Sequence, residues 1–137
     1  MKFSYTSYFP ALPQLKHNKR PELPIEVFFG ERKIKITPVI DTGADYSLFN
    51  IEYAKDLGID LNNALKLPVM GIGGMANESF LVPEIEIQII GIDKKVKIPA
   101  AFIDSKSVDA LLGQLGFFDY FKVVFEKYNN TFEVKPV

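Results

Sequence analysis

The stretch "VIDTGADYSLFN" (residues 39–50) places a polar, turn-forming run directly after two apolar residues. Val39 and Ile40 are typical of a buried strand, and Asp41 follows at its end. Gly43 permits a tight turn and the close approach of another backbone, because glycine has no side chain. A carboxylate in such a place needs hydrogen bonds or a chemical use. Two readings stay open for Asp41: an Asx-turn, in which its side chain caps its own backbone, or an acid that takes part in chemistry.

The composition is that of one folded domain. The chain has 137 residues, of which 47% are apolar and 24% charged, which is enough for one core and too little for two ordinary domains. We therefore expect a single domain over residues 1–137, in which residues 1–22 form an N-terminal strand and a basic, proline-rich linker. The net charge of −1 gives no electrostatic reason to expect a nucleic acid or a membrane as partner.

Several kinds of site are excluded by residues that the chain lacks. It contains no cysteine, which excludes disulfides, cysteine zinc sites and thiol nucleophiles. His17 is its only histidine, which excludes any mechanism or metal site that needs two. We expect neither a metal nor a cofactor. The first residues lack the continuous apolar core of a secretory signal, and no apolar run reaches transmembrane length, so we expect a cytoplasmic setting.

Most apolar segments are short, rich in Val, Ile and Phe, and bounded by Gly, Pro or Asn, which predicts a mainly β protein. One short helix is expected after Asn50, its predicted N-cap, with Gly58 as its end. A strand is expected over 2–8, followed by a hairpin over 24–43 that turns at Gly30-Glu31 and whose second arm runs into Asp41. Strands are expected over 65–104, with turns at 71–74 and 91–94. The segment over 107–121 could begin as a helix, and a final hairpin over 122–137 is expected to turn at Asn129-Asn130.

Two further segments have features that bear on function. "MGIGGM" (residues 70–75) is a glycine-dense reversal that suits a mobile hairpin whose N–H groups approach a ligand, although an ordinary glycine turn explains it as well. "DALLGQL" (residues 109–115) places two leucines before Gly113, where two backbones could cross closely in a core. Leu-Leu-Gly is also common in ordinary cores. Neither segment decides a function by itself.

In their order and spacing, the three segments resemble those of the retropepsin-like aspartic proteases, the single-domain relatives of pepsin. The resemblance extends from about Leu23 to Val134, and its most specific element is "VIDTGA" (residues 39–44). It implies an all-β, single-lobe acid-protease barrel with one or two short helices. It also implies an aspartic endopeptidase that cleaves peptide or protein substrates.

The resemblance implies a role for each matching residue. Asp41 would be the catalytic aspartate, and Thr42 the hydroxyl that bonds across the base of the site to its symmetry mate. Gly43 would present its carbonyl to the substrate, with Ala44 as further support of the site. Asp45 matches an acid that helps to hold the substrate backbone in retroviral members, with a solvated or turn-capping carboxylate as the alternative. The flap tip would comprise Gly71, Ile72, Gly73 and Gly74. The ψ-loop element, which the active-site loop threads, would comprise Leu111, Leu112 and Gly113.

The number of active-site aspartates predicts the assembly. Pepsin-like hydrolysis needs two carboxylates facing one water, whereas this chain has one Asp-Thr-Gly. The nearest second candidate, "IDSK" (residues 103–106), carries Lys106 where glycine is needed. We therefore expect a homodimer whose two-fold axis runs between the two Asp41 side chains. A peptide-binding or dimerisation module that keeps the fold without turnover is the alternative.

Substrate pockets are expected near Asp45, around Ile72 and along residues 98–103, with a loose preference for hydrophobic side chains. Two features depart from the retroviral pattern. Gln114 follows Gly113 where an arginine is usual, and the chain ends in a whole hairpin, as in cellular and bacterial members, rather than in a short strand.

Two other segments receive no catalytic role. "LKHNKRPELP" (residues 15–24), which contains His17, is expected to be a solvated loop, with a proteolytic site that releases residues 1 to about 20 as the alternative. An aromatic cluster near the C-terminus is expected in the core, with a dimer contact as the alternative. Its members are Phe117, Phe118, Tyr120, Phe121 and Phe125.

Overall fold

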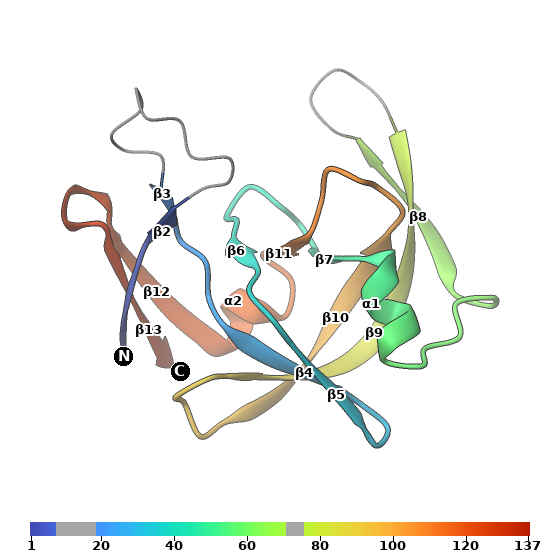
Figure 1. Ribbon diagram of the computed structural model, residues 1–137, viewed down its shortest axis with the longest axis horizontal. Coiled ribbons are helices and arrows are strands. Elements are labelled where there is room, and N and C mark those ends of the chain that lie inside the picture. Colours follow the sequence, from blue (N-terminus) through green and yellow to red (C-terminus); the bar gives the residue numbers. More distant parts are fainter. Residues whose placement is uncertain (8–18, 71–75) are drawn as a thin grey trace.

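The computed structural model describes residues 1–7, 19–70 and 76–137 (Figure 1). Strands make up 55% of the structure, and the main sheet curls into a half-barrel accompanied by two short α-helices. The prediction of a mainly β protein with one or two short helices is confirmed. No helix in the described part of the chain is long and apolar enough to cross a membrane.

The main sheet has eight strands, in the order β5-β4-β9-β10-β7-β11-β6, with β8 paired to β9 outside this path. Their bounds are β4 Ile25–Phe29, β5 Arg32–Ile36, β6 Val39–Ile40, β7 Ser47–Asn50, β8 Leu65–Met70, β9 Ala76–Ile89, β10 Lys95–Ile103 and β11 Ala110–Leu112. The remaining elements are β1 Lys2–Ser4, β2 Thr6–Ser7, β3 Lys19–Arg20, α1 Ile51–Asp56, α2 Phe117–Tyr120, β12 Phe121–Glu126, the 3₁₀ helix η1 Lys127–Asn129 and β13 Thr131–Pro136.

The predicted hairpin over residues 24–43 is shorter than expected. Strands β4 and β5 pair as predicted around Gly30, which has a φ of +58°. The second arm ends at Ile36, however, and β6 is a separate strand that pairs with β11. Pro38 separates the two strands because it has no N–H to continue a ladder, and its carbonyl instead accepts a hydrogen bond of 2.9 Å from Leu23. The chain that leads to Asp41 is therefore positioned by different neighbours from those of β5.

The predicted helix after Asn50 is present as α1. The Asn50 side chain accepts a hydrogen bond of 3.0 Å from the Glu52 N–H, and Gly58 beyond the helix has a φ of +68°. Six residues are too few for a stable isolated helix, so α1 depends on packing. Ala54 and Leu57 supply it, since both are buried against the main core.

The expected helical start of residues 107–121 is wrong. Residues Ala110–Leu112 form strand β11, and the helix α2 begins only at Phe117. Strand β11 has hydrogen-bonded neighbours on both sides, β6 and β7. Ala-Leu-Leu has a good helix propensity, but a central place in a sheet satisfies its backbone groups and buries its side chains, and this tertiary context prevails.

The C-terminal hairpin is present as predicted and forms a second sheet with β1, in the order β1-β13-β12. Asn130 makes the turn in the left-handed conformation, with a φ of +53°. Phe3 stacks on Phe132 across the β1–β13 pair, with ring centroids 5.4 Å apart. The predicted strand over residues 2–8 is therefore divided between this sheet and the short β2–β3 pair. Residues 8–18, including His17 and most of the basic linker, lie outside the described residues.

The aromatic cluster divides between core and surface. Phe117 and Phe121 are buried and stack with ring centroids 5.2 Å apart. Phe118 is partly buried against the same core. The core assignment is wrong for Tyr120 and Phe125, which are 39% and 38% exposed. Tyr120 is the last residue of α2, and Phe125 is the next-to-last residue of β12.

Candidate active site

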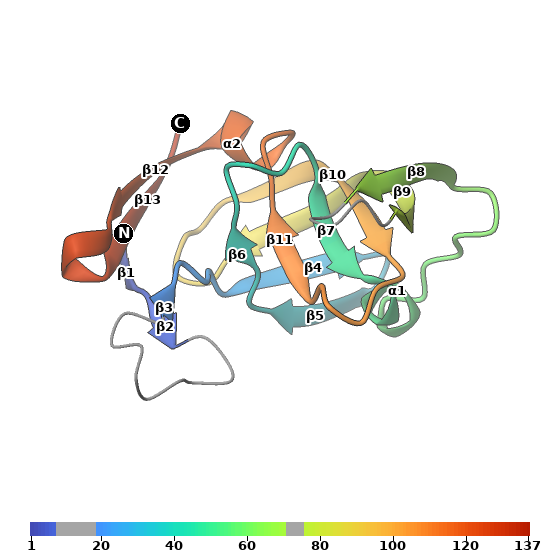
Figure 2. The same ribbon diagram turned by 90° about the horizontal axis from the view of Figure 1, so that it is seen from above.

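The chain that contains Asp41 crosses over a strand that lies between its two neighbours. Strand β6 leads into the loop 41–46, and β7 follows it, yet β6 and β7 do not pair with each other. Strand β11 lies between them, parallel to β6 and antiparallel to β7, as Figure 2 shows. The loop must therefore pass over the end of β11, where Gly113 follows Leu112.

Gly113 is the point at which the two backbones cross. A Cβ atom at this position would overlap the carbonyl oxygen of Tyr46 and lie only 2.7 Å from that of Ala44. Atoms of the backbone cannot rotate away as a side chain can. The requirement for glycine here is steric, because any side chain would push the loop 41–46 off the end of β11.

The segment after Gly113 donates hydrogen bonds to the carbonyl groups of the loop 41–46. The Gln114 and Leu115 N–H groups donate hydrogen bonds of 2.8 Å to the carbonyls of Ala44 and Asp45. The Gln114 side chain adds a third, in which Nε2 donates to the Thr42 carbonyl at 2.8 Å. Three of the loop's carbonyls are thus fixed by donors from two consecutive residues outside the loop.

Ser47 is a member of this arrangement that sequence reasoning missed. Its side chain is fully buried, and its Oγ accepts a hydrogen bond of 3.2 Å from the Gly113 N–H. A buried hydroxyl needs such a partner. The signal in the sequence was a serine at the start of the otherwise apolar run "SLF". Gln114 was noted only for the arginine that it replaces, and its bond to Thr42 was not expected.

Asp41 is partly exposed at the start of the loop. Its N–H donates to the Leu112 carbonyl at 2.9 Å, and its Oδ1 accepts a hydrogen bond of 2.9 Å from the Gly43 N–H. Within the described residues, no other hydrogen bond reaches the carboxylate. The two readings of Asp41 are therefore compatible, since the Asx-turn uses one oxygen and leaves Oδ2 open. Thr42 and Gly43 are exposed beside it.

The structure describes the strands beside the predicted flap tip but not the tip itself. Gly71, Ile72, Gly73 and Gly74 are outside the described residues. The strands on either side, β8 and β9, pair antiparallel from Leu65 opposite Leu81 to Met70 opposite Ala76. Asp45 is exposed, and its carbonyl accepts the hydrogen bond from the Leu115 N–H.

The expected pocket along residues 98–103 is wrong. These residues form β10, which lies between β9 and β7 in the middle of the main sheet. Ile98, Ala100, Ala101 and Phe102 are fully buried. A strand covered on both faces cannot line a pocket for a substrate side chain, so substrate contacts must come from other elements.

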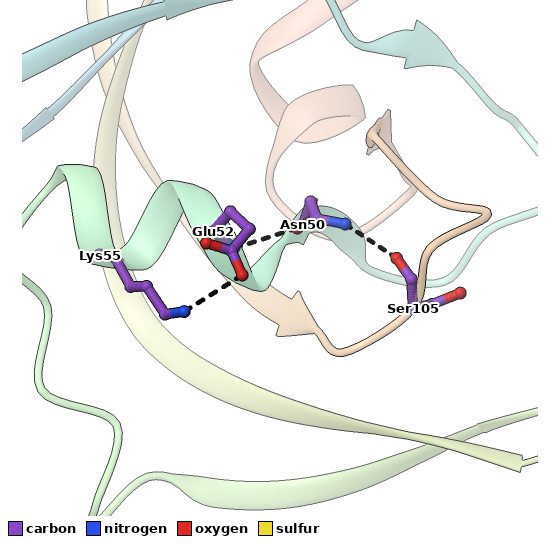
Figure 3. A network of polar contacts seen from close by, with 4 residues as sticks. All are labelled: Asn50, Glu52, Lys55 and Ser105. Carbon is purple, nitrogen blue, oxygen red and sulfur yellow. Dashed lines mark hydrogen bonds and ion pairs between the residues drawn. The ribbon is translucent and has the colours of Figure 1, made fainter.

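The loop that leads into β11 is held from the side of α1. Figure 3 shows that Asn50 caps α1 and that its Nδ2 also donates to the Ser105 carbonyl of this loop, at 2.8 Å. The same Nδ2 donates to the Val108 carbonyl at 2.8 Å. The Tyr53 hydroxyl donates to Asp109 Oδ1 at 2.6 Å. Burial, and then this hydrogen bond, raise the pKa of Tyr53 to about 12, so the hydroxyl stays a donor at neutral pH.

Two solved structures of proteases are similar in fold to this chain. The crystal structure of a retropepsin-like aspartic protease from Rickettsia conorii matches with a TM-score of 0.61 and 19% identity over 98% of each chain. The EIAV protease in complex with the inhibitor HBY-793 matches with a TM-score of 0.53 and 20% identity, over 72% of this chain and 86% of the other. The chain has a retropepsin-like fold. No family model and no curated protein matches the sequence.

Within this retropepsin-like fold, the structure brings some of the expected site residues together. Asp41, Thr42 and Ala44 lie on the loop that crosses Gly113, directly beside Leu111 and Leu112 of β11. "IDSK" does not form a comparable loop in the described structure. Its Asp104 is exposed where β10 ends, and its N–H donates to the Glu78 carbonyl at 3.0 Å. The described chain thus presents one such aspartate.

Proposed function

We propose that this protein is an aspartic endopeptidase whose active form is a homodimer, with one Asp41 from each copy. The observation that carries the proposal is the setting of Asp41: a partly exposed carboxylate with one open oxygen, on a loop whose carbonyls are fixed by Gln114 and Leu115. A loop held in this way keeps its acid in a constant position, which catalysis needs. The likeness to the Rickettsia and EIAV proteases supports the same activity by fold.

The chemistry follows from two carboxylates that face one water. Two such groups in a shared site do not both ionise readily, so the pair holds one proton. The ionised carboxylate removes a proton from the water, whose oxygen bonds to the carbon of the scissile carbonyl. The protonated carboxylate donates to the carbonyl oxygen. The carbon–nitrogen bond then breaks, and the amine leaves with a proton from the pair.

The two-fold arrangement is supported by the exposure of Thr42 and Gly43. Both residues lie beside Asp41 on the surface of the described chain, where a second copy can meet the same patch of the first. One copy supplies only one carboxylate, so a monomer lacks half of the acid–base pair. An extended peptide would bind between the two copies as an added strand, with main-chain hydrogen bonds to both.

One observation favours the second candidate, a peptide-binding or dimerisation module without turnover. The Gly43 N–H already satisfies Oδ1 of Asp41, as it would in an Asx-turn that serves only the fold. In this case the aspartate would cap a turn, and the dimer would bind peptides without cleaving them.

Cleavage of a mixed peptide library between pH 3 and pH 9 separates the two candidates. An enzyme with a shared-proton pair is expected to cleave best at acidic to mildly acidic pH and to lose activity as the pair loses its proton. A statine-type inhibitor should block this cleavage. Binding of peptides without any cleavage would support the module, and activity that rises steadily to pH 9 would contradict the proposed mechanism.

Gln114→Met is expected to lower kcat/KM by roughly threefold to tenfold while costing no more than about 1 kcal/mol of unfolding free energy. Methionine keeps the length of the side chain but removes the donor to the Thr42 carbonyl. The loop then loses the side-chain hydrogen bond that this segment donates to it. Peptide kinetics and thermal unfolding measure the two effects.

Gln88→Met is the matched control for this variant. Gln88 makes a bond of the same kind, from Nε2 to the Ile92 carbonyl at 3.1 Å, in the β9–β10 hairpin. Its loss should affect stability to a similar extent and leave kcat/KM unchanged. Equal effects of the two variants on kcat/KM would show that Gln114 does not position the loop.

A further inference from the structure

A pocket of about 450 Å³ lies against the two strands that meet at the active-site loop. Its apolar lining comes from Val39 of β6, from Ala110 and Leu111 of β11 and from Val108 just before β11. Its polar lining includes Lys106, whose charge the proposed catalytic mechanism does not use. The pocket thus combines an apolar wall with a cation.

The pocket is close to the catalytic aspartate along the chain. Val39 precedes Asp41 by two residues, and side chains two apart on an extended chain project to the same face. Two residues span about 6.6 Å of extended chain, which is also the span of two residues of a bound extended peptide. A substrate residue near the cleaved bond can therefore direct its side chain into this pocket.

Lys106 supplies a positive charge that the described chain does not neutralise. None of the ion pairs among residues 1–7, 19–70 and 76–137 includes its ammonium group. The other charged groups of the lining are engaged: Arg20 pairs with Glu22 at 2.7 Å, and Asp109 accepts the hydrogen bond of Tyr53. Since Glu22 balances Arg20, the charges of the lining outside the described ion pairs are the Lys106 ammonium group and the Asp109 carboxylate, of which the latter is held by Tyr53.

The loop that bears Lys106 is held firmly at its base. Ser105 and Ser107 contact each other through their hydroxyls at 2.9 Å, and the Ser107 N–H donates to Ser105 Oγ at 3.2 Å. Asn50 fixes the Ser105 carbonyl, as Figure 3 shows. The ammonium group therefore starts from a fixed backbone at the rim of the pocket, which reduces the ordering cost when it pairs with a ligand.

We infer that this pocket accepts an acidic side chain of the peptide substrate, foremost glutamate, and that Lys106 determines this preference. The inference rests on the proposed function and gives it a substrate class. The methylene groups of a glutamate would lie on Val39 and Leu111, and its carboxylate would pair with the Lys106 ammonium. A lysine in the same place would meet a like charge, which disfavours it.

The test compares three peptides that are identical except for glutamate, glutamine or lysine at one position beside the cleavage site, measured at pH 6 and low salt. Glutamate is ionised at this pH. For the native protein, kcat/KM should be about tenfold higher for the glutamate peptide than for the lysine peptide. This ratio corresponds to a single favourable charge contact. Lys106→Glu should reverse this order, so that the lysine peptide is cleaved better than the glutamate peptide.

Lys122→Glu is the control for a general charge effect. Lys122 is exposed on β12 of the second sheet and takes part in none of the ion pairs of the described residues. This variant makes the same change of net charge and should keep the native preference. An equal shift in both variants, or no preference for glutamate in the native protein, would overturn the inference.

A binding measurement separates failure of this inference from failure of the proposed activity. The amide resonances of residues 106–109 in ¹⁵N-labelled protein are followed by NMR during titration with the glutamate and glutamine peptides. If no peptide is cleaved, the proposed activity fails. The inference about the pocket would still be supported if the native protein bound the glutamate peptide more tightly than the glutamine peptide and Lys106→Glu removed this difference. Equal binding of both peptides would overturn the pocket whether or not cleavage occurs.

Discussion

Gly113→Ala is expected to destabilise the fold by about 3 kcal/mol or more and to abolish cleavage. The added methyl group would overlap the Tyr46 carbonyl oxygen and lie 2.6 Å from the Tyr46 carbonyl carbon. Both atoms belong to the backbone, so relief requires that the loop move away from β11. Such a move also breaks the hydrogen bonds from Gln114 and Leu115 that hold the loop. Chemical unfolding and peptide cleavage report the two effects.

Gly30→Ala is the control for this prediction. A Cβ atom at Gly30 has no neighbour within 4 Å, but the φ of +58° is unfavourable for alanine. This variant should lose about 1 kcal/mol from backbone strain and keep its activity. The φ of Gly113 is not in the left-handed region. The loss of stability in Gly113→Ala therefore reports the close backbone crossing and not backbone strain. A Gly113→Ala protein as stable and active as the native one would contradict the crossing.

Asp41→Asn is expected to lower kcat/KM by about 10³-fold or more with little change in stability. Asparagine keeps an Oδ1 atom that can accept the Gly43 hydrogen bond, so the turn persists. It cannot take a proton from water at the pH of the reaction. Peptide kinetics and thermal unfolding therefore separate loss of chemistry from loss of fold.

Asp104→Asn makes the same chemical change at the second candidate aspartate. Asp104 is exposed directly after β10, and its carboxylate makes no hydrogen bond within the described residues. The variant should keep full activity. If Asp104→Asn were inactive and Asp41→Asn active, the assignment of the catalytic aspartate would be wrong.

Local patterns in the sequence were sufficient for elements whose partners are near in the chain. The turns at Gly30 and at Asn130 were predicted because each joins two adjacent strands through a residue suited to a positive φ. The helix α1 was predicted from its cap and its spacing. In each case the deciding interactions are made within a few residues.

Strand β11 shows where local patterns fail. Ala110–Leu112 is short, and its partners β6 and β7 precede it by about sixty residues or more along the chain. Such long-range pairing leaves no signal in the segment itself, so its helix propensity was misleading. The same cause explains the error at residues 98–103, whose burial depends on strands from other parts of the chain.

At the candidate site, the residue types were more informative than the contacts. The run "VIDTGA" and the Leu-Leu-Gly indicated a loop and a close backbone crossing, and the structure brings these segments together. The bonds that hold the loop join residues far apart: 66 positions separate Gly113 from Ser47, and 72 separate Gln114 from Thr42. Neither pairing can be read from spacing, so both emerged only from the structure.

Mixing native protein with the Asp41→Asn variant tests most directly whether two copies share one active site. The variant carries an affinity tag, and co-purification of native chains shows that copies have exchanged. In a homodimer with a shared pair, activity per native chain should fall with the native fraction, to about half at equal amounts and about a tenth at a ninefold excess of variant. Activity per native chain that stays constant at every ratio would contradict the account, because each chain would then act alone.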